Sequence, residues 1–197
     1  VRYPDVKLIL RQGSPTQIST LVTSGEADIA IATEAIELFY ELVMLPCYEW
    51  NRCIVVPPKH PLLRLKELTL EAITQYSIIT YDFAFTGRSK TNQAFESKGL
   101  SPNVVLTAID SDVIKTYVEL GLGIGILAKM AFDPKRDKHL RSIDASHLFE
   151  SSTTRIGISR NSYLRRYIFD FIEMFAPHLT EVTIRTALQK RLEHPKS

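Results

Sequence analysis

VKLILRQGSPTQISTLVTSGEADIAIA, residues 6–32, reads as a strand, a polar turn, a helix, a glycine and a second strand. The apolar run at residues 6–10 predicts a strand, residues 15–24 predict a helix that ends at Gly25, and residues 28–32 predict another strand. The same order recurs at residues 77–108. Because alternating strands and helices indicate parallel-rich sheets with helices on their faces, two such units predict an α/β fold of two small Rossmann-like lobes.

Residues 11–17, Arg-Gln-Gly-Ser-Pro-Thr-Gln, form the turn before the first helix. Ser14 stands at the N-cap position, Pro15 at the first helical position and Gln17 three residues after the cap, which is the pattern of an ordinary capping box. Thr16 adds a second hydroxyl that capping does not require. A helix start also presents backbone N–H groups at the positive end of the helix dipole, where an anion or a carboxylate can bind. From these residues alone, the capping and the ligand-binding interpretations both remain open.

The rest of the chain continues the alternation of strands and helices. Further strands are expected at residues 42–47, 52–56, 77–81, 104–108, 124–127, 140–143 and 154–159, and further helices at residues 69–75, 86–95, 112–120, 163–175 and 181–192.

The run Gly121-Leu-Gly-Ile-Gly125 resembles a dinucleotide fingerprint, but it follows a helix and precedes a strand, the reverse of the order that such a site needs. It therefore predicts a helix end with a tight turn, and we expect no cofactor.

The composition argues against several functional classes. The chain has 24 Lys and Arg against 22 Asp and Glu, so by itself it lacks the positive surplus of a nucleic-acid-binding domain. No apolar stretch is long enough for a membrane span.

Cys47 and Cys53 have no zinc-site spacing, and they are expected to be buried reduced thiols of a cytoplasmic protein. Because Val1 is neither an initiator Met nor the start of a signal peptide, the sequence is interpreted as a fragment.

Polar and aromatic side chains gather where predicted strands end and helices begin, which is the edge where open α/β sheets bind ligands. Three helix starts, at residues 14–17, 81–88 and 110–112, are expected to face one crevice between the lobes. The candidate ligand-binding residues are Ser14, Thr16, Gln17, Tyr81, Phe83, Thr86 and Thr116. For Thr116, a hydrogen bond to the carbonyl of its own helix is the alternative. Because these groups supply no nucleophile with a base and no metal ligands, a binding site is predicted and not an enzyme.

Five stretches of the sequence together resemble a known family. They are Tyr3-Pro4 followed by Val-x-Leu, the polar turn at residues 11–17, Gly25-Glu-Ala-Asp28-Ile-Ala-Ile, Pro-x-His60-Pro61-Leu62 and Gly121-Leu-Gly-Ile-Gly125. Over residues 1–178 their order and spacing resemble the effector-binding domain of LysR-type transcriptional regulators. The resemblance implies two lobes of the type II periplasmic-binding-protein kind, joined by strands that cross near residues 78–81 and 156–159. One lobe is then expected at residues 1–79 and 158–197, and the other at residues 80–157.

Further motifs narrow the resemblance to the CysB/Cbl branch of sulfur-assimilation regulators, and the match looks closer to Cbl. These motifs are residues 12–17, Tyr48-x-Trp50-Asn-Arg52, Phe83-x-Phe85-Thr-Gly-Arg-Ser89 and Asp112-Val-Ile-Lys-Thr-Tyr117. In that branch the turn that matches Ser14, Thr16 and Gln17, with the threonine that matches Thr116, holds a sulfate-like anion between the lobes. The effectors that this implies are sulfate, thiosulfate, sulfide, acetylserine and adenosine 5′-phosphosulfate.

The resemblance also implies partners for this chain. Such regulators carry an N-terminal winged helix-turn-helix, which this sequence lacks, and they bind promoter DNA as homotetramers. Contact with DNA and RNA polymerase is therefore expected only in the full-length protein, while this domain is expected to form a homodimer without a membrane partner. The genes controlled are those for cysteine synthesis and sulfonate use, and the residues beyond 180 run past the usual end of the family. The alternatives are a periplasmic solute-binding protein for a small anion or amino acid, and a small α/β enzyme.

Overall fold

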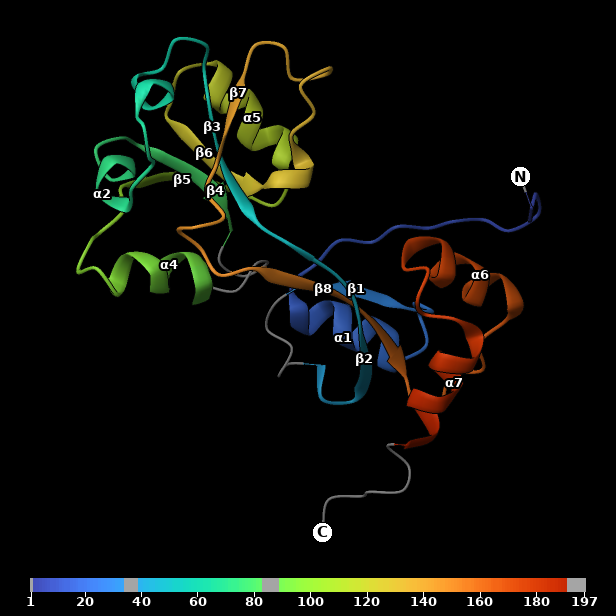
Figure 1. The fold of residues 1–197 in the computed structure, drawn as a ribbon. Helices are drawn as coiled ribbons and strands as arrows, with labels where there is room; N and C mark the ends of the chain where they lie inside the picture. The colour runs from blue at the N-terminus through green and yellow to red at the C-terminus, as the bar shows by residue number, and fades with distance from the viewer. Residues whose placement is uncertain (1, 34–38, 83–88, 191–197) are drawn as a thin grey trace. The chain divides into compact units, whose positions relative to one another are not determined.

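The structure is a computed structural model that describes residues 2–33, 39–82 and 89–190. The chain divides into two compact units, unit 1 with residues 1–48 and 153–197 and unit 2 with residues 49–152. Each unit has its own sheet with helices packed on it (Figure 1). The predicted α/β class is therefore confirmed.

Unit 1 contains a three-stranded sheet in the order β1-β8-β2, built from β1 (Ala30–Ala32), β8 (Ser152–Ser159) and β2 (Leu42–Trp50). β1 pairs with β8 in antiparallel orientation. One core cluster joins Val22 of α1 (Pro15–Thr23) to β1 and to the start of β2. A second cluster joins β2 and β8 to α6 (Arg166–Phe175) and α7 (Glu181–Lys190). The unit thus buries one helix pair and one single helix against its sheet.

Unit 2 contains a five-stranded sheet in the order β5-β4-β6-β3-β7. Its strands are β5 (Val104–Ala108), β4 (Ile78–Tyr81), β6 (Ile124–Ala128), β3 (Arg52–Val56) and β7 (Arg141–Asp144). β4 runs parallel to β5 and β6, whereas β3 runs antiparallel to β6 and β7. The sheet is therefore mixed, although the sequence predicted mainly parallel pairing.

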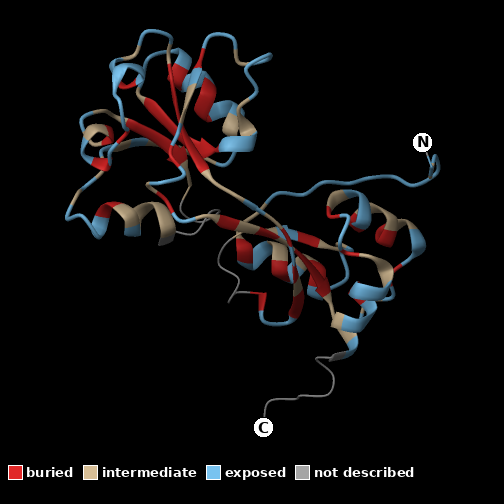
Figure 2. Ribbon diagram, viewed as in Figure 1, coloured by how far each residue is buried: buried red, intermediate tan, exposed pale blue. Residues whose placement is uncertain are grey.

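Helices cover both faces of the unit 2 sheet (Figure 2). α2 (Leu70–Ile73) and α4 (Ser89–Glu96) share a core cluster with Ile54 and Ile78, and α5 (Ser111–Glu119) shares another with Val55 and Ile79. Successive side chains of a strand point to opposite faces, so β3 and β6 are buried along their whole length. Two short 3₁₀ turns, η2 (Pro61–Arg64) and η3 (Lys129–Ala131), complete the described elements of this unit.

The boundaries between the units differ from those that the resemblance implied. The chain enters unit 2 near the end of β2 and leaves it at the start of β8. β4, which was expected to cross between the lobes, lies inside the unit 2 sheet because it pairs with both β5 and β6. β3 already belongs to that sheet through its pairing with β6 and β7. The compact units thus meet at 48/49 and 152/153, whereas the resemblance implied boundaries at 79/80 and 157/158.

The predicted strand at residues 6–10 is wrong. These residues belong to no sheet, and the exposed fractions of Val6, Leu8, Ile9 and Leu10 are 42, 67, 65 and 80%. The segment is anchored near its start, where the Tyr3 hydroxyl donates a hydrogen bond to the Asp170 carboxylate of α6. An apolar, β-branched run favours an extended backbone locally. A strand forms only where a neighbouring strand also hydrogen-bonds the backbone N–H and C=O groups.

Candidate functional site

The turn at residues 13–17, called the α1 turn here, is a complete capping box. The Ser14 Oγ accepts a hydrogen bond from the Gln17 N–H at 3.3 Å, and the Gln17 Oε1 accepts one from the Ser14 N–H at 2.9 Å. A Cβ at Gly13 would lie 3.0 Å from the Gln17 Oε1, so the glycine leaves room for that side chain to fold back. The capping interpretation is therefore confirmed for Ser14 and Gln17.

Thr16 differs from its neighbours in the α1 turn. Its side chain is exposed, and within the described residues neither its hydroxyl nor its backbone N–H donates a hydrogen bond. Pro15 has no N–H, so Thr16 supplies the first donor of the helix. The first turn of α1 contains no acidic residue that would neutralise the positive end of the helix dipole. The turn thus offers two neutral donors that suit an oxyanion.

In unit 2 the described candidates, Tyr81 and Thr116, belong to β4 and α5, which follow one edge of the sheet. The parallel strands β4, β5 and β6 end at Tyr81, Ala108 and Ala128, so their carboxyl ends share this edge. The Tyr81 hydroxyl accepts a hydrogen bond from the Ala128 N–H at 3.5 Å and interacts with the side chain of Ser111 at the start of α5. Burial raises the pKa of Tyr81, so the phenol stays neutral and can offer a hydrogen bond.

Thr116 lies in the second turn of α5, where its Oγ donates a hydrogen bond to the carbonyl oxygen of Asp112 at 2.8 Å. The alternative that the sequence left open, a threonine bonded to its own helix, is therefore present in the structure. The start of α5 carries two carboxylates, because Asp110 accepts from the Asp112 N–H at 2.7 Å and Asp112 follows in the first turn. These charges oppose an oxyanion at the start of α5. Of these two helix starts, α1 is the one suited to an anion.

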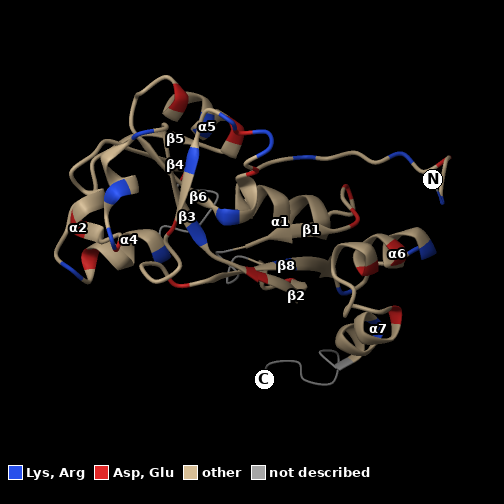
Figure 3. Ribbon diagram, turned by 45° about the horizontal axis from the view of Figure 1, so that its top comes forward, with Lys and Arg blue, Asp and Glu red and all other residues tan. Residues whose placement is uncertain are grey.

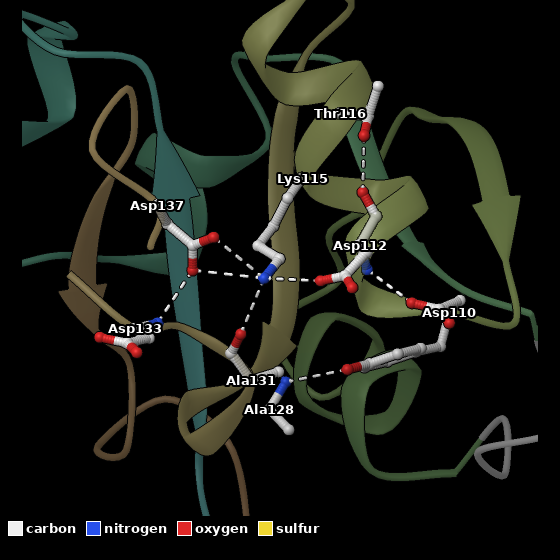
Figure 4. Close-up of polar contacts among 9 residues, drawn as sticks. Asp110, Asp112, Lys115, Thr116, Ala128, Ala131, Asp133 and Asp137 are labelled. Carbon is white, nitrogen blue, oxygen red and sulfur yellow. Dashed lines mark hydrogen bonds and ion pairs between the residues drawn. The ribbon is translucent and has the colours of Figure 1, made fainter. Parts of the chain in front are cut away.

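Sequence reasoning missed Lys115, whose side chain is only 11% exposed. Its Nζ lies 2.8 Å from the Asp112 Oδ1, 3.1 Å from the Asp137 Oδ1 and 3.1 Å from the carbonyl oxygen of Ala131 (Figure 4). Burial alone would lower the pKa of Lys115, but hydrogen bonds to Asp112 and Asp137 outweigh it and raise the pKa. Lys115 therefore stays charged. The sequence signal that could have revealed Lys115 is its position in the predicted helix. It lies next to Ile114 on the side of α5 that faces the protein interior.

The structure places the predicted site residues in two groups. Ser14, Thr16 and Gln17 share the α1 turn of unit 1, and Tyr81 and Thr116 belong to unit 2. Phe83 and Thr86 lie outside the described residues.

Cys47 and Cys53 are buried and free, and burial raises the pKa of both thiols. Across residues 2–33, 39–82 and 89–190, no three His, Cys, Asp or Glu side chains are grouped so that they could hold a metal ion. None of the helices in these ranges is both long and apolar enough to cross a membrane. Figure 3 shows basic and acidic residues interspersed along both units.

The sequence matches the family described as the LysR substrate binding domain over residues 1–180. The HTH-type transcriptional regulator SsuR of Burkholderia cenocepacia is 55% identical over 95% of this chain, and the regulator CysB of the same organism is 52% identical over 98%. The chain spans 61% of the length of each of these relatives. The crystal structure of the cofactor-binding domain of the Cbl transcriptional regulator has a TM-score of 0.86 and 42% identity, and the match covers 94% of this chain and 81% of that chain.

These identities correct one expectation. The short motifs indicated a closer match to Cbl, but identity to SsuR and CysB is higher than identity to the Cbl domain. The motifs cover a small part of the chain, whereas the identity counts every aligned position.

Proposed function

Because the chain belongs to the family of LysR substrate-binding domains, we propose that it is the effector-sensing domain of a transcriptional regulator of sulfur assimilation. The identities of 55 and 52% with the regulators SsuR and CysB support this role over that of a periplasmic solute-binding protein or an enzyme. Promoter DNA and RNA polymerase are then contacted in the cytoplasm by the full-length regulator. The genes it controls are those for sulfonate use and cysteine synthesis.

The effector that we propose is a small compound with a sulfate-like oxyanion. The observation that carries this proposal is Thr16, with an exposed hydroxyl and backbone N–H at the start of a helix whose first turn has no acidic residue. Such neutral donors bind a sulfate group without a dedicated arginine, and the helix dipole adds to the attraction. Ser14 and Gln17 hold the turn in shape. The other residues that the sequence proposes for the effector are Tyr81, Phe83, Thr86 and Thr116, of which Phe83 and Thr86 lie outside the described residues. The candidates with such a group are sulfate, thiosulfate and adenosine 5′-phosphosulfate. Sulfide and acetylserine, which carry no sulfate group, are the other effector candidates that the resemblance implies.

Thermal unfolding tests this proposal directly. Sulfate, thiosulfate, acetylserine and adenosine 5′-phosphosulfate are each added, and a ligand at about 100 times its Kd should add about 2.7 kcal/mol to the free energy of unfolding. For a chain of this length that corresponds to a rise of about 5–10 °C in the unfolding temperature. Sodium chloride at matched ionic strength is the control for unspecific salt effects. If none of sulfate, thiosulfate and adenosine 5′-phosphosulfate raises the unfolding temperature above this control, the effector proposal is contradicted.

We further propose that two copies of this domain associate through the outer face of α5 and the neighbouring edge strand β5. Five exposed apolar side chains lie on these elements and on the loop between them, namely Val105, Ile109, Val113, Tyr117 and Leu120. Val113, Tyr117 and Leu120 follow helical spacing, so they form one stripe along α5. β5 is the end strand of the described sheet, and an edge strand can pair with another chain.

Charge substitution tests the dimer surface. Sedimentation velocity is expected to show a dimer for the parent chain and a monomer for Val113→Lys combined with Leu120→Glu, because two charges in an apolar contact are costly. Met174→Lys, at an exposed apolar position of α6, is the matched control and should leave the dimer intact. An unchanged dimer in the double variant would place the contact elsewhere.

A further inference from the structure

The start of the chain is attached to unit 1 through Tyr3, beside α6 (Figure 1). Tyr3 is partly buried, whereas residues 2 and 4–12 are exposed. Its ring packs edge-on against the ring of Tyr167 with 6.1 Å between the centroids, and its hydroxyl donates a hydrogen bond to the Asp170 carboxylate. Tyr167 and Asp170 are three residues apart in α6, so they lie on the same face of the helix. Tyr3, Tyr167 and Asp170 together are called the Tyr3 anchor here.

Asp170 binds the start of the chain with a carboxylate that is mostly shielded from water. Its side chain is 11% exposed, and its Oδ2 also lies 3.0 Å from the Nη1 of Arg2. The Nε of Arg166 donates a hydrogen bond to the Asp170 Oδ1 at 3.3 Å. The side chains of Arg2 and Arg166 are 71 and 69% exposed, so their ion pairs with Asp170 contribute little. The hydrogen bond from the Tyr3 hydroxyl to this charged acceptor is therefore the main polar contact of the Tyr3 anchor.

The residues that follow the Tyr3 anchor have few contacts. Within the described residues, the side chains of residues 6–12 form one ion pair, at 3.6 Å between Arg11 and Glu26, and both of these side chains are more than half exposed. The Val6 N–H donates a hydrogen bond to the Tyr3 carbonyl oxygen at 3.3 Å. An exposed segment with so few contacts opens at little cost in free energy. The Tyr3 anchor is thus what holds residues 2–5 on unit 1.

The helix that carries the anchor also contacts both strands that lead to unit 2. Ile168 and Ile172 of α6 share a core cluster with Val43 of β2 and Ile156 of β8. The chain enters unit 2 near the end of β2 and returns at the start of β8. Because protein cores are close-packed, a shift of either strand displaces α6 and the Tyr3 anchor with it.

We propose that the Tyr3 anchor is the point at which unit 1 holds the chain arriving from the DNA-binding part of the full-length regulator, and that it carries the effect of effector binding to that part. This inference rests on the proposed function, in which a DNA-binding part precedes this domain. Pro4 supports the attachment, because the residue before a proline is confined to extended conformations and Tyr3 then loses less freedom when it docks. Without the anchor, residues 2–12 form a loose tether, and a movement of α6 no longer reaches the DNA-binding part.

The backbone dynamics of the ligand-free chain test the anchor itself. Order parameters from ¹⁵N relaxation are measured for the amides of residues 3 and 5, since Pro4 has no N–H. Values near about 0.85 are expected in the parent chain and values below about 0.6 in Asp170→Ala. Asp170→Ala retains the fold because alanine is favourable within a helix. Equal order parameters in the two chains would overturn the proposal.

Two further variants show whether the specific contact is responsible. Glu173→Ala removes a carboxylate from an exposed position of the same helix and should leave residues 3 and 5 ordered. Tyr3→Phe keeps the ring, removes only the hydroxyl and leaves the cores of both units untouched, and it should lower the order parameters below the parent values. Loosening by Glu173→Ala as large as that by Asp170→Ala, or parent values in Tyr3→Phe, would contradict the anchor.

The full-length regulator tests the transmission to DNA. Its affinity for a promoter fragment is measured by fluorescence anisotropy with and without sulfate or thiosulfate, in the parent and in Asp170→Ala. Because an effector commonly changes the affinity at a second site by about 5–150-fold, the parent is expected to show a change of at least about fivefold. In Asp170→Ala the change should fall below about twofold, while the domain still binds the two anions with the parent affinity.

The two measurements distinguish failure of this inference from failure of the proposed function. If the anions change DNA binding equally in the parent and in Asp170→Ala, the proposed function stands and the inference is overturned. If neither anion changes DNA binding of the parent regulator, the proposed function and the transmission both fail. Loss of order at residues 3 and 5 in Asp170→Ala would still support the attachment in that case.

Discussion

Replacing Asp137 by leucine is expected to lower the free energy of unfolding by about 3–5 kcal/mol. The substitution removes one of the two carboxylates that pair with Lys115, so the buried ammonium keeps the Ala131 carbonyl and the exposed carboxylate of Asp112. The Asp133 N–H also loses its acceptor. Urea unfolding followed by circular dichroism measures the change.

The double variant Asp137→Leu with Lys115→Met is the matched control for this prediction. It removes both buried charges, and replacing a whole buried ion pair by apolar side chains is often neutral. The double variant is therefore expected to recover at least about half of the stability that the single substitution removes. If Asp137→Leu alone is as stable as the parent chain, the pair with Lys115 is not the buried contact that the structure shows.

Replacing Gly123 by alanine is expected to cost about 3 kcal/mol and to lower the unfolding temperature by about 6–12 °C. A Cβ at this position would lie 2.3 Å from the carbonyl oxygen of Ser77 and 2.9 Å from its carbonyl carbon. The same oxygen accepts the hydrogen bond from the Ile124 N–H at 2.9 Å, which holds the start of β6 against the residue before β4. Because the obstacle is backbone at the start of a buried strand, no side-chain movement relieves the clash.

Gly125→Ala is the matched control for Gly123→Ala. The three nearest atoms to a Cβ at Gly125 are methyl carbons of Val118, Ile114 and Leu127, at 3.1, 3.2 and 3.7 Å. These side chains can shift slightly, so the cost should be smaller than at Gly123. Equal costs at the two glycines would show that the backbone contact of Gly123 is not the cause.

Most helices and the unit 2 strands could be predicted because their patterns are local. Ser14 and Gln17 mark the start of α1. The continuous apolar run Cys53–Val56 of β3 is typical of a strand that is buried on both faces of its sheet. Two features depend on distant parts of the chain and could not be predicted in this way. Residues 6–10 have the composition of a strand but no partner, and the crossings lie in β2 and β8 because β3 pairs with β6 and β7.

The capping geometry of the α1 turn could be predicted to a similar extent, whereas its role as an effector site stays a prediction. The residue types of the α1 turn indicate oxyanion chemistry, since serine, threonine and glutamine at a helix start leave neutral donors. Lys115 escaped prediction because a lysine in a helix usually faces water, and its partner Asp137 lies 22 residues away in the sequence. The carboxylates at the start of α5 changed the expectation that every helix start favours an anion. These carboxylates already offset the positive end of the α5 dipole, so the dipole no longer attracts an anion there.

The most direct test of the central claim is the affinity for sulfate and thiosulfate of Thr16→Val compared with Thr16→Ser. Valine keeps the shape of threonine without its hydroxyl, whereas serine keeps the hydroxyl. Because a hydrogen bond to a charged group contributes about 1.5–3 kcal/mol, Thr16→Val is expected to weaken binding at least about tenfold, and Thr16→Ser to bind like the parent chain. Unchanged unfolding temperatures without ligand confirm that the fold is retained. Equal affinities for the parent chain and Thr16→Val would reduce the α1 turn to a helix cap and contradict the proposed effector site.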